Sequence, residues 1–158
     1  MMNRKILDIV RLFLISPEFF VLVLFWDLFS LYPKPMILLG SEIVREGSMV
    51  QYIALLPVAL LTMAYSLSKD ALRPLDGDKN RLLYEWPEYW RLKFRALAAL
   101  FFCLVASAGS IGLWVFKMLL APSLLGVGFA AAVVLALVST TSLYLGYLRL
   151  REILQGGS

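Results

Sequence analysis

The sequence predicts an all-α fold, namely a polytopic integral membrane protein with four transmembrane helices and a short N-terminal amphipathic interfacial helix. The chain is 61% hydrophobic and 16% charged, whereas a soluble domain carries about a quarter charged residues. The charges cluster between apolar runs, as expected for membrane spans of about 20 residues each. These runs do not alternate apolar and polar residues, which excludes the strands of a membrane barrel. We therefore expect a single membrane domain over residues 1–155, with the Gly-Gly-Ser of 156–158 set aside as a linker remnant.

The N-terminal third is predicted to hold an interfacial helix and the first span. Residues 4–15 have a basic side and an apolar side, which is typical of a helix lying on a membrane surface. Ser16, Pro17 and Glu18 follow as a helix-start signature: an N-cap hydroxyl, a proline at the first position and an acid in the first turn. The first span is therefore placed over residues 17–32. The alternative is one helix over both segments, kinked at Pro17.

The later spans are read from runs without charge. After a polar connection over 33–48, part of which could return to the surface, the second span is expected over 49–67. Its Pro57 is expected to bend the helix by freeing the carbonyl of Ile53. Residues 68–95 form a cytoplasmic loop. The third and fourth spans cover 96–116 and 123–148, and neither contains a charged residue.

The distribution of Lys and Arg predicts the orientation in a bacterial inner membrane. With four spans, twelve cations fall on the N-terminal flank, the central loop and the C-terminal tail, against three on the other side. Cytoplasmic segments carry the excess of Lys and Arg. Both termini and the central loop are therefore expected in the cytoplasm, and the external cations are Lys34, Arg45 and Lys117.

A basic and aromatic segment leads into the third span. Its residues are Trp86, Tyr89, Trp90, Arg91, Lys93 and Arg95. Aromatic rings favour the headgroup region, and Lys and Arg reach phosphates from there, so one interpretation is an interfacial anchor. The other is a docking surface for a cytoplasmic protein partner. Nucleic acid is not expected as a partner, because the nearby bilayer accounts for the same residues.

Small residues and a few polar residues mark the spans. Two stripes at helical spacing predict that the third and fourth spans form a tight hairpin or pack across a subunit boundary; they comprise Ala99, Cys103, Ala106 and Ser110, and Gly128, Ala132, Ala136 and Thr140. Asp27 is the acid within a span, interpreted as a locally hydrated structural group or as an ion, proton or subunit contact. Hydroxyls at Ser139, Thr140, Thr141 and Ser142 are expected to bond to their own or a neighbouring helix.

The composition argues against most enzyme classes. The chain has no His and one Cys, so neither a His-based general base nor a zinc site with several His and Cys ligands is available. We expect no enzyme activity, no metal and no cofactor. The preferred hypothesis is a homo-oligomeric inner-membrane anchor or sensor that docks a cytoplasmic partner. The alternative is an ion- or proton-conducting pore or transporter subunit that uses Asp27 and the hydroxyls of residues 139–142.

The four-span architecture suggests one biological setting by analogy alone. Small four-span proteins of this general form occur as membrane components of bacterial defence or immunity operons. Because architecture does not determine function, this analogy adds only a hypothesis of antiviral defence to the preferred role of scaffold or sensor.

Overall fold

The described part of the chain is all-helical. The computed structural model describes residues 16–45, 52–53, 55–72 and 89–155. It contains five α-helices and, within these ranges, no strand: α2 (Pro17–Leu31), α3 (Pro33–Val44), α4 (Leu56–Leu72), α6 (Tyr89–Val115) and α7 (Pro122–Gln155). The predicted all-α class is therefore confirmed for this part of the chain. The interfacial helix expected over residues 4–15 lies outside it.

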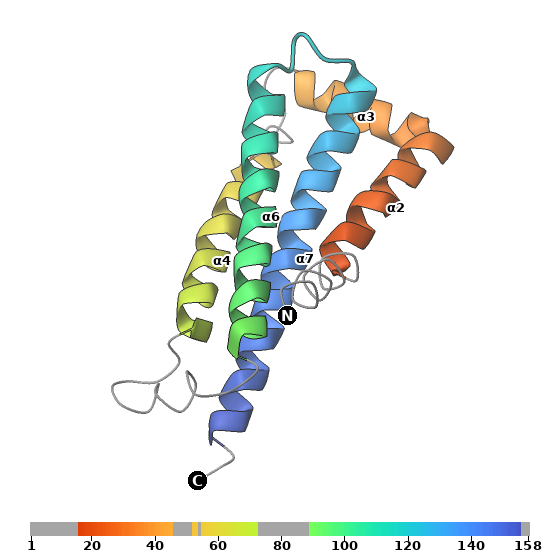
Figure 1. Ribbon diagram of the computed structural model, residues 1–158. Helices are drawn as coiled ribbons and strands as arrows, with labels where there is room; N and C mark the ends of the chain where they lie inside the picture. Colours follow the sequence, from red (N-terminus) through yellow and green to blue (C-terminus); the bar gives the residue numbers. More distant parts are fainter. Residues whose placement is uncertain (1–15, 46–51, 54, 73–88, 156–158) are drawn as a thin grey trace, which may run out of the picture.

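Helix α7 is the centre of the arrangement. It contacts each of the other four helices. Figure 1 shows α4 and α6 running alongside it, α2 inclined on its other side, and α3 lying across one end near the turn that joins α6 to α7. The end of α4, the start of α6 and the end of α7 lie towards the opposite end, and the start of α2 lies beside the middle part of α7.

The start of α2 follows the helix-start signature in the sequence. The backbone N–H of Phe19 donates to Ser16 Oγ at 3.2 Å, so Ser16 is the N-cap. Pro17 occupies the first helical position, where its missing N–H costs no intrahelical hydrogen bond. The Ser16 side chain thus satisfies one of the N–H groups that a helix start leaves without an intrahelical partner.

Helix α3 occupies most of the segment expected to be a polar connection over 33–48. Pro33 and Pro35 look like helix breakers, but they lie in the first turn of α3, where proline is tolerated. Gly40 and Ile43 are buried. An added Cβ at Gly40 would meet the backbone of Pro122, and one at Gly126 would meet the backbone of Met36. The two glycines therefore let the α3 and α7 backbones touch where the helices cross.

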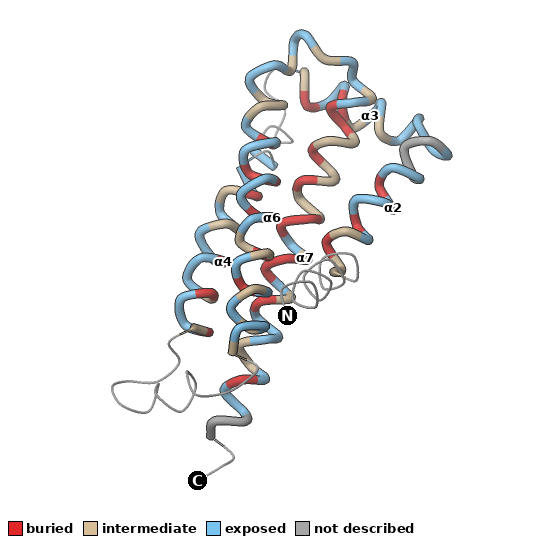
Figure 2. Tube along the Cα trace, viewed as in Figure 1, coloured by how far each residue is buried: buried red, intermediate tan, exposed pale blue. Residues whose placement is uncertain are grey.

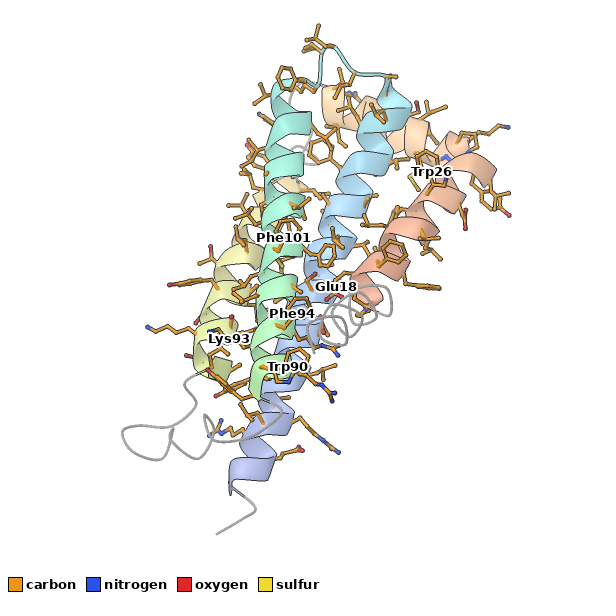
Figure 3. The ribbon with its side chains drawn as sticks, viewed as in Figure 1. Glu18, Trp26, Trp90, Lys93, Phe94 and Phe101 are labelled. Atoms are coloured by element: carbon orange, nitrogen blue, oxygen red, sulfur yellow. The ribbon has the colours of Figure 1, made fainter. Side chains whose placement is uncertain are left out.

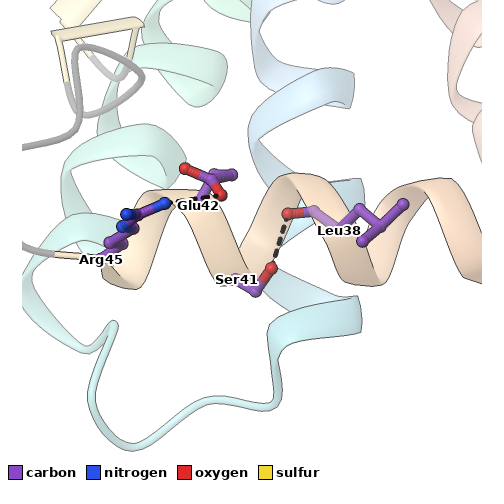
Figure 4. Close-up of polar contacts among 4 residues, drawn as sticks. All are labelled: Leu38, Ser41, Glu42 and Arg45. Atoms are coloured by element: carbon purple, nitrogen blue, oxygen red, sulfur yellow. Dashed lines mark hydrogen bonds and ion pairs between the residues drawn. The ribbon is translucent and has the colours of Figure 1, made fainter.

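The exposed end of α3 is held by local polar contacts (Figure 4). Ser41 Oγ donates to the carbonyl oxygen of Leu38 at 2.8 Å. Arg45 lies 3.6 Å from the carboxylate of Glu42, and both side chains are well exposed. Such an exposed i,i+3 pair contributes only about 0.3–0.5 kcal/mol. Packing against α7, more than these contacts, therefore stabilises α3.

Two of the five helices are long and apolar enough to cross a membrane: Tyr89–Val115 and Pro122–Glu152. This makes the structure compatible with a membrane protein. The expected four spans are not supported by helix length, because α2 has 15 residues and α4 has 17. At 1.5 Å per residue these helices measure only about 22 Å and 26 Å, against about 30 Å of hydrocarbon.

Pro57 corrects a second expectation. It is the second residue of α4, which begins at Leu56 rather than at the start of the apolar run. Proline in a first turn removes an N–H that has no intrahelical partner, so it starts the helix and does not bend it.

The interior is built from small side chains and a few large ones. Val21 and Phe25 of α2 pack against Phe102 of α6 and Leu135 of α7. A second cluster joins Ala64, Ala96, Ala99, Cys103 and Leu143, and a third joins Ile43, Leu125 and Phe129. Figure 2 shows the buried residues on the faces that the helices turn towards one another. The three clusters follow the length of α7, which supplies a residue to each.

Candidate functional site

Helices α6 and α7 approach closely along their small-residue stripes. Within these stripes all residues but Gly128 are buried: Ala99, Cys103, Ala106, Ser110, Ala132, Ala136 and Thr140. Cys103 Sγ lies 3.8 Å from the carbonyl oxygen of Ala136 and 3.8 Å from Thr140 Oγ1. Gly128 faces Leu113, whose side chain would meet an added Cβ. The stripes therefore meet within one chain, which is the hairpin alternative of the sequence prediction.

Hydroxyl groups join α4 to this hairpin. Ser107 Oγ lies 2.9 Å from the carbonyl oxygen of Pro57 and 2.8 Å from that of Cys103, so its single proton is shared between two acceptors. Thr140 Oγ1 donates to the carbonyl oxygen of Leu60 at 3.4 Å. Ser107 and Thr140 are both buried. The backbone of α4 near its start is thus bonded to side chains of both α6 and α7.

Among the residues that the structure describes, Glu18 is the acid that faces the interior. It is 5% exposed, and Figure 3 shows it at the lower end of α2, on the side of α6 and α7. Its carboxyl group and the Cys103 thiol lie within range of an electrostatic interaction. Ser139 Oγ is also fully buried; it lies near the Cys103 thiol but makes no hydrogen bond of ordinary geometry among the described residues. Glu18, Cys103, Ser139 and Thr140, with Ser107 one turn further along α6, form what we call the polar cluster.

Asp27 lies apart from the polar cluster. Its side chain is exposed on α2. It follows Glu18 by nine residues, which is about 13 Å along a helix. The structure therefore does not bring Asp27 together with the hydroxyls of residues 139–142; the acid close to the cluster is Glu18. The spacing of Glu18, Val21 and Phe25, at i, i+3 and i+7, is the signal in the sequence that could have found it.

The basic and aromatic segment is described from Tyr89 onward, and Trp86 lies outside the described residues. Tyr89 is half-buried, whereas Trp90, Arg91, Lys93 and Arg95 are exposed. The Arg91 guanidinium lies 5.5 Å from the centroid of the Trp90 ring, within the range of a cation–π contact. Arg95 instead reaches α7, where it donates to Ser142 Oγ at 3.1 Å. The segment thus has an aromatic part on α6 and one Arg that joins two helices.

The remaining hydroxyls of the predicted set lie closer to the surface of α7. Thr141 is exposed and Ser142 is half-buried. Among the described residues, no three His, Cys, Asp or Glu side chains lie close enough together to hold a metal ion. The arrangement offers instead a buried polar cluster and a basic end of the helix bundle. Comparison with protein-family models, with curated proteins and with solved structures finds no match.

Proposed function

We propose that this chain is a multi-pass protein of the bacterial inner membrane and that it serves as an anchor or sensor which docks a cytoplasmic protein partner. The observation that carries the proposal is the distribution of residues around α6. Its buried face is made of Ala, Cys and Ser with one Phe, whereas Leu97, Phe101 and Leu104 are more than half exposed. Large apolar side chains outside and small ones inside are favourable when the surrounding solvent is lipid.

Helix α2 supports the same proposal. It buries Glu18, Val21 and Phe25 but leaves apolar side chains exposed on its other faces, with Phe20 at 69% and Trp26 at 73%. Figure 3 shows Trp26 near the upper end of α2 and Phe101 midway along α6. An apolar covering over both helices would remove these side chains from water, which is favourable by about 25 cal/mol for each Å² of apolar surface covered.

In the proposed topology α2 and α4 are short spans shielded by α6 and α7. The start of α6 and the end of α7 lie at the same end of the bundle and carry the exposed cations Arg91, Lys93, Arg149 and Arg151. Helix α3 lies at the other end, near the turn that holds Lys117. The Lys117 ammonium is 4.7 Å from the centroid of the Trp114 ring. Because Lys and Arg stay in the cytoplasm, both termini and the central loop are proposed to be cytoplasmic.

Reporter fusions test this topology. A fusion at Arg45 should report an external location and a fusion after Gln155 a cytoplasmic one. Cytoplasmic behaviour at Arg45 would contradict it. Retention of the protein in the membrane pellet after an alkaline wash tests insertion itself, and release into the supernatant would contradict membrane insertion.

The docking surface in this proposal is the basic end, defined as Trp90, Arg91 and Lys93 of α6 with Arg149 and Arg151 of α7. All five residues are exposed. Helix α7 has 34 residues, about 51 Å at 1.5 Å per residue, so about 20 Å of it would extend beyond the hydrocarbon. A projecting basic helix and a neighbouring aromatic residue suit a protein partner with an acidic surface.

Capture from a lysate of the source cell tests partner docking. Arg91→Gln with Lys93→Gln should reduce the captured partner, whereas the control Lys117→Gln, at the other end, should not. Equal capture by both variants would contradict docking at the basic end. Mass measurement in mild detergent tests the proposed homo-oligomer, and a strict monomer would contradict it. A role in a defence or immunity operon is part of this proposal by architectural analogy only.

Ion or proton conduction is the second candidate, because the polar cluster lies inside the bundle. Buried ionisable groups at membrane depth commonly mark ion or proton paths. Liposome flux measurements separate the two functions. Conduction through the cluster predicts flux that Glu18→Gln abolishes and Asp27→Asn leaves unchanged. Absence of flux in the unsubstituted protein would exclude this candidate.

A further inference from the structure

Two adjoining cavities form one groove beside α6 and α7. Both are lined by Arg95, Ser142 and Leu145. The first, of about 370 Å³, is also lined by Pro17 of α2 and by Leu137, Val138 and Thr141 of α7. The second, of about 560 Å³, continues along α7 to Arg149 and Glu152. We call the two together the Arg95 groove.

The Arg95 groove lies at the depth of lipid headgroups in the proposed membrane orientation. Twenty residues separate Arg95 from Val115 at the far end of α6, and twenty separate Ser142 from Pro122 at the start of α7. At 1.5 Å per residue each distance is about 30 Å, which equals the thickness of the hydrocarbon. If the turn between α6 and α7 lies at one membrane surface, the contact between Arg95 and Ser142 lies at the other.

The groove presents polar groups at this depth and an apolar wall below it. The Arg95 guanidinium has five N–H donors. Among the described residues, it donates a hydrogen bond to Ser142 Oγ. The exposed Arg149 supplies a second cation and is 3.8 Å from the Glu152 carboxylate, so the wider cavity keeps a net positive charge. Leu137 is 43% exposed. With Val138 it continues the groove towards the middle of the bundle.

We propose that the Arg95 groove binds the headgroup of an anionic phospholipid. The phosphate accepts hydrogen bonds from Arg95 and from the hydroxyls of Thr141 and Ser142, and one acyl chain lies along Leu137 and Val138. Basic pockets between helices on the cytoplasmic side of a membrane are suited to such headgroups. A free phosphate would leave the apolar wall of Leu137 and Val138 uncovered. An acidic peptide in the cytoplasm would not reach that wall, because the wall lies below the depth of the headgroups. The site rests on the proposed membrane location.

Native mass spectrometry of the detergent-purified full chain tests the proposal. Phosphatidylglycerol and phosphatidylcholine with the same acyl chains are added separately. The proposal predicts retention of phosphatidylglycerol over phosphatidylcholine. Arg95→Gln should weaken retention of phosphatidylglycerol about fivefold, which corresponds to about 1 kcal/mol per basic residue near the membrane surface. The control Lys69→Gln removes an exposed cation near the end of α4, outside the groove, and should retain the lipid as the unsubstituted protein does.

The outcomes are separable from those of the proposed function. Equal retention of the two lipids by the unsubstituted protein would overturn the site even if Arg95→Gln failed to fold. Unchanged retention by a folded Arg95→Gln protein, or displacement of the lipid by inorganic phosphate, would also overturn it. In these cases a protein still released from membranes only by detergent keeps its proposed location. A protein that stays folded in solution without detergent would overturn both.

Discussion

Substitution of Gly126 tests the close crossing of α3 and α7. In the interior of α7, Gly126→Ala brings a gain in helix propensity of about 1 kcal/mol. The added Cβ, however, meets the backbone of Met36. Backbone cannot rotate away as a side chain can, so α3 must shift as a unit. Overpacking of this kind costs about 1–3 kcal/mol. The net change in the free energy of unfolding should therefore lie between about zero and a loss of 2 kcal/mol.

A matched control is available on the same helix. Gly146 is exposed, and an added Cβ there meets nothing within 4 Å. Gly146→Ala should therefore keep only the propensity gain, up to about 1 kcal/mol. The two variants should differ by about 1–3 kcal/mol. For a chain of this size that difference corresponds to a separation in Tm of about 2–12 °C.

Thermal unfolding in detergent, followed by circular dichroism, measures the difference. The unsubstituted protein and both variants are compared at equal detergent concentration. If Gly126→Ala and Gly146→Ala stabilised the chain by the same amount, the backbone contact between α3 and α7 would be refuted. Gly40→Ala, whose added Cβ would meet the backbone of Pro122, checks the same crossing from the other side.

Three further predictions follow from the capping and packing contacts. Ser16→Ala should lower the free energy of unfolding by about 1 kcal/mol because it removes the N-cap of α2, and Ser16→Gly should cost less; urea-induced unfolding measures both. Ser107→Ala should lower the free energy of unfolding by about 0.5–1.5 kcal/mol in the same assay, because it removes the hydroxyl proton that the Pro57 and Cys103 carbonyl oxygens share. The control Ser66→Ala, at an exposed position of α4, should change stability by less than about 0.5 kcal/mol. Equal effects of the two substitutions would contradict the hydrogen bond between Ser107 and α4. Cys103, fully buried, should react with a maleimide only after denaturation; rapid labelling of the folded protein, detected by mass, would contradict the hairpin packing.

The parts of the fold that the sequence predicts are those determined by local chemistry. Long runs without charge indicate α6 and α7, because apolar length is a property of the segment itself. Ser16 and Pro17 indicate where α2 begins, because an N-cap acts within one turn. The small-residue stripes through Ala106 and through Ala136 each lie at helical spacing and so predict which faces meet.

The parts that the sequence misses depend on contacts between distant segments. Helix α3 resembles a loop because it carries two prolines, and its place against α7 depends on Gly126, which lies far along the chain. Glu18 resembles a simple first-turn acid until α2 is placed against the hairpin. The hydrogen bond between Arg95 and Ser142 joins residues 47 positions apart. No local pattern predicts a pairing of that kind.

The central position of α7 also has a consequence for biosynthesis. Among the described helices α7 is the last to be translated, yet each of the others packs against it. About 90 residues must be added between the end of α2 and the start of α7, which takes roughly 5–20 s at cellular rates of synthesis. During that interval α2 has no α7 to pack against. The early helices must therefore keep the faces that they turn towards α7 uncovered until the ribosome has delivered their common partner.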